Sequence, residues 1–85
     1  MSFTADDIKG APNKVVGTKQ TLKFLEQDKV EAVFLAEDAE ARVLSPLIKL
    51  CKEKNVSCNY AGSMAELGCI AGIKVGSAAV AILKE

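Results

Sequence analysis

Two continuous apolar runs of strand length stand out in the pattern of hydrophobic and polar positions. Residues 30–36 read Val-Glu-Ala-Val-Phe-Leu-Ala, and residues 77–83 read Ser-Ala-Ala-Val-Ala-Ile-Leu. Neighbouring side chains of a strand point to opposite faces, so a run that is apolar at successive positions predicts a strand covered on both faces. We therefore expect these two segments to be buried strands of a sheet that carries helices on both sides.

Two shorter segments also predict strands. Residues 14–16 read Lys-Val-Val, and in residues 56–60 the side chains of Val56, Cys58 and Tyr60 alternate with polar ones. Alternation with a period of two predicts a strand with one buried face. We expect Val56, Cys58 and Tyr60 to form that buried face.

Four segments between these strands carry helix signals. The first is residues 3–9, with Thr4 as N-cap, and the second is residues 18–28. The third is residues 45–54, in which Ser45 is the N-cap and Pro46 the first helical residue, and a separate helical turn precedes it at 41–44. The fourth is residues 63–71, which begin with a Ser63–Glu66 capping box and end at Gly72. Asn55 suits the C-cap of the third helix. Strands and helices thus alternate along one domain of residues 1–85, which predicts the α/β class with a single sheet. The pattern does not give the strand order.

Composition and charge exclude several kinds of protein. The chain has 11 basic and 11 acidic residues, no histidine, and three cysteines, Cys51, Cys58 and Cys69, without a close pair. We expect no metal site, no cofactor and reduced, buried thiols in a cytoplasmic protein. Neither a secretory leader nor a run of about 20 apolar residues is present. No nucleophile motif, P-loop or base for a cysteine is evident, so we expect a protein that is not an enzyme.

The candidate chemistry lies in Gly17-Thr18-Lys19-Gln20-Thr21-Leu22-Lys23. A strand that turns through glycine into a helix leaves free backbone N–H groups, which attract anions such as phosphate. At about 100° per residue, Lys19, Gln20 and Lys23 fall on one arc of this helix. Such an arc is either an ordinary solvated helix face or a set of donors for phosphates and base edges.

Three segments together resemble the ribosomal L-seven-Ae / L-thirty-e family of kink-turn RNA-binding proteins, and most closely its small bacterial members. They are residues 17–23, the Ala36-Glu37-Asp38-Ala39 stretch, and Leu67–Gly72 continuing through Gly76–Ile82. The resemblance implies a three-layer α/β/α sandwich around a single mixed sheet of about four strands. It also implies recognition of a sharply bent RNA with tandem sheared G·A pairs.

The resemblance carries over to particular residues. Where the family usually has Asn and Glu, this chain has Lys19 and Gln20, as in the bacterial subgroup, and it keeps the lysine at Lys23. Lys19 still donates to guanine O6 and N7, and Gln20 accepts from a guanine amino group without the strength of a charged acceptor. Met64 stands where several relatives have a lysine.

The same resemblance assigns a second set of contacts. The loop of Ile73, Lys74 and Val75 is expected to cover a flipped-out nucleotide, and Glu40 and Leu44 to line its pocket. Alternatives remain for several of these residues. Ile73 and Val75 either meet the RNA or anchor their loop on the core, and Glu40 is either a pocket residue or a solvated acid. Thr18 also suits a cap or a core-facing position, and Lys14 an ordinary surface position. The complete set of expected RNA-binding residues is Lys14, Gly17, Thr18, Lys19, Gln20, Lys23, Glu40, Leu44, Ile73, Lys74 and Val75.

The resulting functional expectation is a monomeric protein that binds and stabilises kink-turns in ribosomal or mRNA-leader RNA, as part of a ribosome or another ribonucleoprotein. The competing expectation is a protein-interaction module on the same fold. The neutral charge slightly favours the second, because nucleic-acid binders usually carry a basic excess. The Lys19, Gln20 and Lys23 face together with the 73–75 loop favours the first, because a scaffold needs neither.

Overall fold

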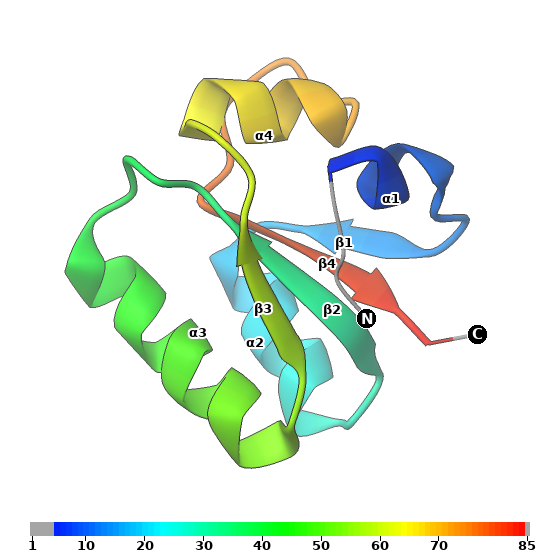
Figure 1. Ribbon diagram of the computed structural model, residues 1–85, viewed down its shortest axis with the longest axis vertical. Coiled ribbons are helices and arrows are strands. Elements are labelled where there is room, and N and C mark those ends of the chain that lie inside the picture. The colour runs from blue at the N-terminus through cyan, green and yellow to red at the C-terminus, as the bar shows by residue number, and fades with distance from the viewer. Residues whose placement is uncertain (1–4, 85) are drawn as a thin grey trace.

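The computed structural model describes residues 5–84, with side chains from Asp7 onward. Four helices and four strands alternate along these residues (Figure 1). In chain order they are α1 (Ala5–Gly10), β1 (Lys14–Val16), α2 (Thr18–Glu26), β2 (Val30–Leu35), α3 (Ala41–Lys54), β3 (Ser57–Tyr60), α4 (Met64–Ile70) and β4 (Ala79–Leu83). The expected N-cap Thr4 lies outside the described residues. None of the described helices is both long enough and apolar enough to cross a membrane.

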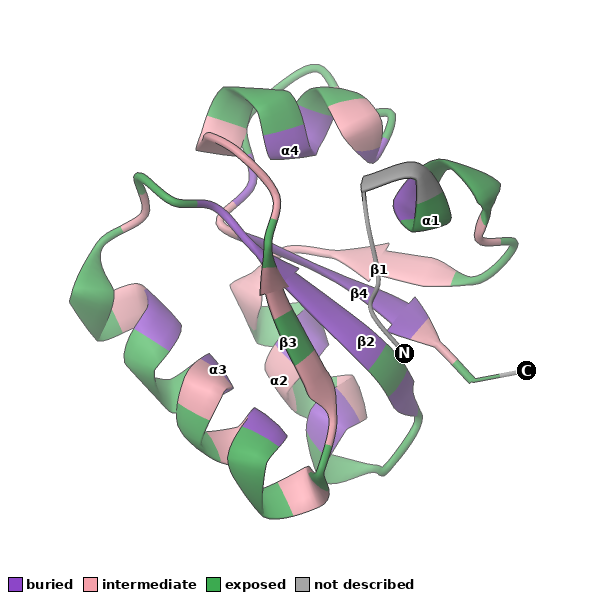
Figure 2. Ribbon diagram, viewed as in Figure 1, coloured by how far each residue is buried: buried purple, intermediate pink, exposed green. Residues whose placement is uncertain are grey.

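The four strands form one mixed sheet in the order β1-β4-β2-β3. β4 runs antiparallel to both β1 and β2, whereas β2 and β3 are parallel. The two apolar segments therefore become the two central strands, and Figure 2 shows both as almost entirely buried. This confirms the expectation that they are covered on both faces.

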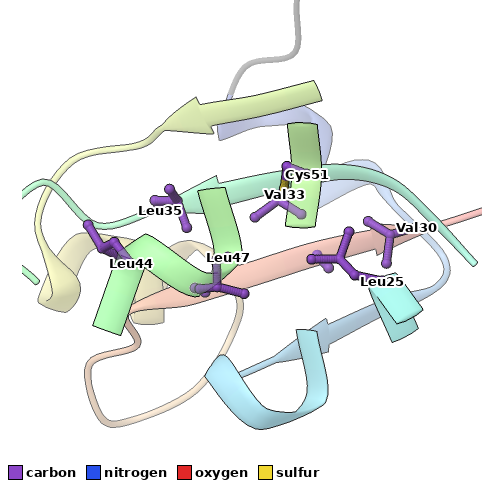
Figure 3. Packing of buried hydrophobic residues seen from close by; sticks show 9 residues of the cluster. Leu25, Val30, Val33, Leu35, Leu44, Leu47 and Cys51 are labelled. Carbon is purple, nitrogen blue, oxygen red and sulfur yellow. The ribbon is translucent and has the colours of Figure 1, made fainter. Parts of the chain in front are cut away.

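Helices cover the sheet on both sides, as Figure 1 shows, with α2 and α3 on one face and α1 and α4 on the other. Each face has its own hydrophobic cluster. Leu25 of α2 and Leu47 of α3 belong to the cluster that contains Val30 and Val33 (Figure 3), while Ile8 of α1 and Leu67 of α4 belong to the cluster around Phe34. The expected three-layer α/β/α sandwich is confirmed.

The third helix departs from its expected start. Ser45 and Pro46 do not begin it; α3 is continuous from Ala41, after the N-cap Glu40, and Pro46 lies inside it. A proline within a helix removes one backbone hydrogen bond. Here Pro46 lies on the exposed side of the helix, where water can bond to the carbonyl group that has lost its N–H donor. Leu44 before the proline and Leu47 after it are both buried against the sheet. The expected C-cap is confirmed, because Asn55 has the left-handed conformation (φ 56°, ψ 40°).

The expected buried face of β3 is confirmed only at Val56, which is half-buried and packs against the core. Cys58 and Tyr60 on the same face are exposed, and Ser57 and Asn59 on the other face are half-buried. β3 is an edge strand paired only with β2, and its inward polar side chains are satisfied locally. The Asn59 side-chain amide donates to Ser57 Oγ at 3.1 Å and lies 3.5 Å from the Val33 carbonyl oxygen. The expectation of buried thiols holds for Cys51 alone, because Cys58 and Cys69 are exposed.

Helix α4 lies so close to the loop that follows it that one of its positions admits only glycine. A Cβ atom on Gly68 would collide with the carbonyl oxygen of Val75 and lie 3.1 Å from the Gly76 Cα. Both obstacles are backbone atoms, which cannot rotate away as a side chain can.

We therefore expect Gly68→Ala to lower the free energy of unfolding by about 1–3 kcal/mol, the usual cost of overpacking. Urea unfolding monitored by circular dichroism measures the change. Gly10→Ala is the matched control, because a Cβ there meets nothing within 4 Å. Equal stabilities of the two variants would contradict the close approach.

Candidate nucleic-acid interface

The turn from β1 into α2 depends on Gly17. Its φ of 106° is a conformation that glycine tolerates far better than other residues, and no neighbouring atom would obstruct a side chain there. The Gly17 N–H donates to the Ala79 carbonyl at 2.8 Å, and its own carbonyl accepts from the backbone and hydroxyl of Thr21 at 3.0 and 2.8 Å. These bonds fix the start of α2 against the beginning of β4.

The first turn of α2 is uncapped and cationic. No side chain caps it and no acidic residue lies within it. Thr18 is half-buried, Lys19, Gln20 and Lys23 are exposed, and the opposite face buries Thr21 and Leu25. Within residues 7–84, neither Lys19 nor Lys23 forms an ion pair. The backbone N–H groups and two ammonium groups therefore present one positive surface, as the helical arc predicted.

Part of the acidic stretch after β2 is engaged in hydrogen bonds and an ion pair within the protein. The Asp38 carboxylate accepts a hydrogen bond from the Met64 N–H at 2.7 Å, so it caps α4 rather than the next helix in the chain. The Glu37 N–H donates to the Gly62 carbonyl at 2.7 Å. Glu40 pairs with Arg42 at 2.7 Å on the surface, where such a pair contributes little to stability.

The loop after α4 is anchored at both ends and exposed at its tip. The Ile73 N–H donates to the Gly68 carbonyl and the Ser77 N–H to the Met64 carbonyl, both at 3.0 Å. Ile73 is half-buried, whereas Lys74 is exposed and Val75 is 71% exposed. Ile73 thus contributes to anchoring the loop, but Val75 does not, and its apolar side chain is available to a ligand.

These segments meet at one end of the sheet. The N–H group of Gly17 donates to the carbonyl of Ala79, the first residue of β4, and the N–H group of Ala36 donates to the carbonyl of Ala78 just before it. The start of α2, the β2–α3 loop and the loop after α4 therefore lie at the same end of the sheet, the upper left in Figure 1. Lys14 is different: it stands at the other end of β1, and its ammonium group donates to the Ile8 carbonyl at 3.2 Å.

A groove that the sequence reasoning missed opens between α3 and β3. Its volume is about 570 Å³, and it is lined by Glu37, Ala39, Ala41, Leu44, Ser45, Ile48, Lys49, Lys52 and Tyr60. Leu44 is the only expected site residue among them, and Glu40 lies outside. The spacing of Lys49 and Lys52 on one side of a helix was the available signal. The exposure of Tyr60 was not predicted, because the alternation in residues 56–60 placed it on a buried face.

Two cysteines meet beside this groove. The buried Cys51 thiol donates a hydrogen bond to the Cys58 sulfur, which lowers the pKa of Cys58 to about 7, although partial burial opposes the shift. The pKa of Cys51 is raised, mainly by the same hydrogen bond and further by burial of its thiol. Cys58 is therefore the thiol of this pair that ionises first.

Comparison with known proteins agrees with this architecture. A sequence profile of the ribosomal protein L7Ae/L30e/S12e/Gadd45 family matches residues 7–85. An RNA-binding protein of Bacillus pumilus is 41% identical over 78 residues, which cover 92% of this chain and 95% of that protein. An RNA-binding protein of Halalkalibacterium halodurans is 43% identical over 79 residues, covering 93% of this chain and 96% of the relative.

Solved structures show the same fold. The 15.5kD RNA binding protein of Giardia lamblia superposes with a TM-score of 0.85 at 25% identity, covering 95% of this chain and 71% of that one. A protein of unknown function from Bacillus halodurans superposes with a TM-score of 0.81 at 19% identity, covering 94% and 80%.

The cysteine pair yields a pH-dependent prediction. In a Cys69→Ser background, we expect alkylation of Cys58 by iodoacetamide to rise with pH and reach half its maximal rate near pH 7, because a lowered pKa exposes the thiolate at lower pH. Removing the donor by Cys51→Ala shifts that midpoint upward, toward the value of about 8.5 for a free thiol. Mass spectrometry of quenched samples measures the rate. An unmoved midpoint in Cys51→Ala would show that the hydrogen bond does not set the pKa of Cys58.

Proposed function

This chain belongs to the ribosomal protein L7Ae/L30e/S12e/Gadd45 family, and on that premise we propose that it binds RNA and recognises kink-turns. The observation that carries the proposal is the uncapped, cationic start of α2, with Lys19, Gln20 and Lys23 exposed on one face. The RNA-binding proteins that resemble the chain over almost their whole length support it.

In this proposal the start of α2 reads the sheared G·A pairs. Lys19 donates to guanine O6 and N7, and Gln20 accepts from a guanine amino group. Lys23 and the backbone N–H group of Thr18 meet phosphates, which a helix N-terminus attracts. Phosphate contacts position the protein, and the few base contacts provide selectivity.

The two loops at the same end of the sheet complete the proposed contact. Leu44 is the buried apolar wall of a pocket for the extruded base, and Glu40 reaches that base by leaving its exposed ion pair with Arg42. Ile73 and the exposed Val75 cover that nucleotide, and Lys74 reaches a phosphate. Lys14 is left out of the proposed contact, because its ammonium group is bonded to the Ile8 carbonyl at the far end of β1.

The neutral net charge shapes the proposed binding. With 11 basic and 11 acidic residues, long-range attraction to RNA is weak, so affinity depends on fit to the bent shape. Binding the kinked state more tightly than the extended one shifts the RNA toward the kink. The proposed targets are ribosomal or mRNA-leader RNAs in the cytoplasm, bound by a monomer, and no chemical step is part of the proposal.

The double variant Lys19→Ala/Lys23→Ala tests the site. We expect it to weaken kink-turn binding by about 1–3 kcal/mol for the lost base contact, with a further loss for the phosphate contact. Calorimetric titration against a kink-turn RNA measures the change, and the fold stays intact because both side chains are exposed. The matched control is Lys29→Ala/Lys84→Ala, which removes two exposed lysines near the opposite end of the sheet.

A second RNA separates shape recognition from simple attraction. In it, both sheared G·A pairs are replaced by Watson–Crick pairs, and we expect the wild-type protein to bind it far more weakly. Equal, strongly salt-dependent binding to both RNAs would leave only electrostatic attraction. Unchanged affinity of Lys19→Ala/Lys23→Ala would refute the site, and absence of binding to either RNA would favour a protein partner.

A further inference from the structure

The groove between α3 and β3 combines three kinds of surface. Its floor is apolar, with Leu44 and Ile48 from α3. Lys49 and Lys52 lie along its α3 side, and Tyr60 stands at the end of β3. A volume of about 570 Å³ lies in the range of small-molecule sites in proteins. The groove is thus large enough for a nucleotide-sized ligand with an apolar part and an anionic part.

Tyr60 is exposed in a way that packing does not require. Its exposed fraction is 57%, and it is one of two large hydrophobic residues left exposed in the described part of the chain, the other being Val75. β3 is an edge strand, and no element of residues 5–84 pairs with its outer side. An exposed aromatic ring beside lysines is the combination that proteins use to stack an unpaired base.

The lysines of the groove are available for an anion. Within residues 7–84, neither Lys49 nor Lys52 forms an ion pair, whereas Lys54 at the end of the same helix pairs with Asp28 at 3.2 Å. Lys49 and Lys52 are three residues apart and so lie on neighbouring positions of one helix side. Two close ammonium groups suit a phosphate, and Glu37 at the groove's edge can accept from a base amino group.

The groove continues the proposed RNA surface. Glu37 and Ala39 belong to the β2–α3 loop, which lies at the same end of the sheet as the start of α2. Leu44 is shared with the proposed base pocket, and from there the groove extends along α3 as far as Lys52, about 12 Å at the rise of a helix. An RNA strand that passes from the α2 surface over the β2–α3 loop reaches the groove at Glu37 and Ala39.

We propose that this groove binds an unpaired nucleotide of the same RNA, with its base stacked on Tyr60 and its phosphate held by Lys49 and Lys52. The proposal rests on the proposed function, since the strand reaches the groove from the α2 surface. It adds a site for single-stranded RNA beyond the contacts at α2 and at the loop of residues 73–75. The protein would then bind more tightly to a kink-turn that has an unpaired segment next to the kink.

The test compares three RNAs that share one kink-turn. The first has two blunt helices, and each of the others carries a three-nucleotide single-stranded extension on a different helix end. We expect one extension to tighten wild-type binding about tenfold, at the low end of what a base stacked on an aromatic ring contributes. Tyr60→Ala and Lys49→Ala/Lys52→Ala remove this gain and bind the blunt RNA as tightly as the wild type.

Two control variants separate stacking and local charge from general effects. Tyr60→Phe keeps the ring and therefore keeps the gain. Lys29→Ala/Lys84→Ala removes the same number of exposed lysines away from the groove and also keeps it. A 5-iodouridine in the extension, cross-linked by light, is expected to modify the peptide that contains Tyr60. Cross-linking confined to other peptides would contradict the proposed path of the strand.

The blunt RNA separates failure of this inference from failure of the proposed function. Tight binding of the blunt RNA with no gain from either extension would overturn the groove proposal and leave kink-turn recognition intact. A gain that survives in Tyr60→Ala and in Lys49→Ala/Lys52→Ala would also overturn it. No binding of the blunt RNA would overturn both, and would direct the search toward a peptide ligand for the groove.

Discussion

The residues at the start of β4 join the two segments that form the proposed binding end of the molecule. The carbonyl group of Ala79, the first residue of β4, accepts a hydrogen bond from the Gly17 N–H, and that of Ala78 before it accepts one from the Ala36 N–H. The first bond positions the start of α2, and the second positions the loop that follows β2. Because β4 is central and antiparallel to both neighbours, a single strand end sets the distance between two segments that are far apart in sequence. The proposed RNA surface depends on that junction.

Small residues make this junction compact. β4 reads Ala-Val-Ala-Ile-Leu, so alternate side chains on one face are single methyl groups and the helices above them approach closely. Gly68 brings α4 into contact with the backbone of the 73–76 loop, and Gly76 lies against Met64 in the same way. Dense packing of this kind leaves the loop little freedom, so Lys74 and Val75 are presented from a preformed support.

Charge is separated locally in a chain that is neutral as a whole. Two acidic side chains at the proposed binding end are engaged by the protein itself: Asp38 caps α4, and Glu40 pairs with Arg42. Lys19, Lys23, Lys49 and Lys52 have no such partners within residues 7–84. A neutral protein can therefore present cations to RNA without a basic excess, at the cost of weak long-range steering. This separation resolves the conflict between the composition and the proposed function.

The α/β class, the two buried strands and the exposed face of α2 with Lys19, Gln20 and Lys23 could all be predicted from the amino-acid sequence. These follow from periodicity and from glycine at a turn, which are local properties of a chain. The sequence pattern misplaced the start of α3, because burial of Leu44 and Leu47 on both sides of Pro46 outweighs the local preference of proline for a first turn. The exposure of Cys58 and Tyr60 in β3, the capping of α4 by Asp38 and the groove beside Tyr60 could be seen only in the folded molecule. Each of these depends on which segments become neighbours, and neighbours distant in sequence leave no mark in a local pattern.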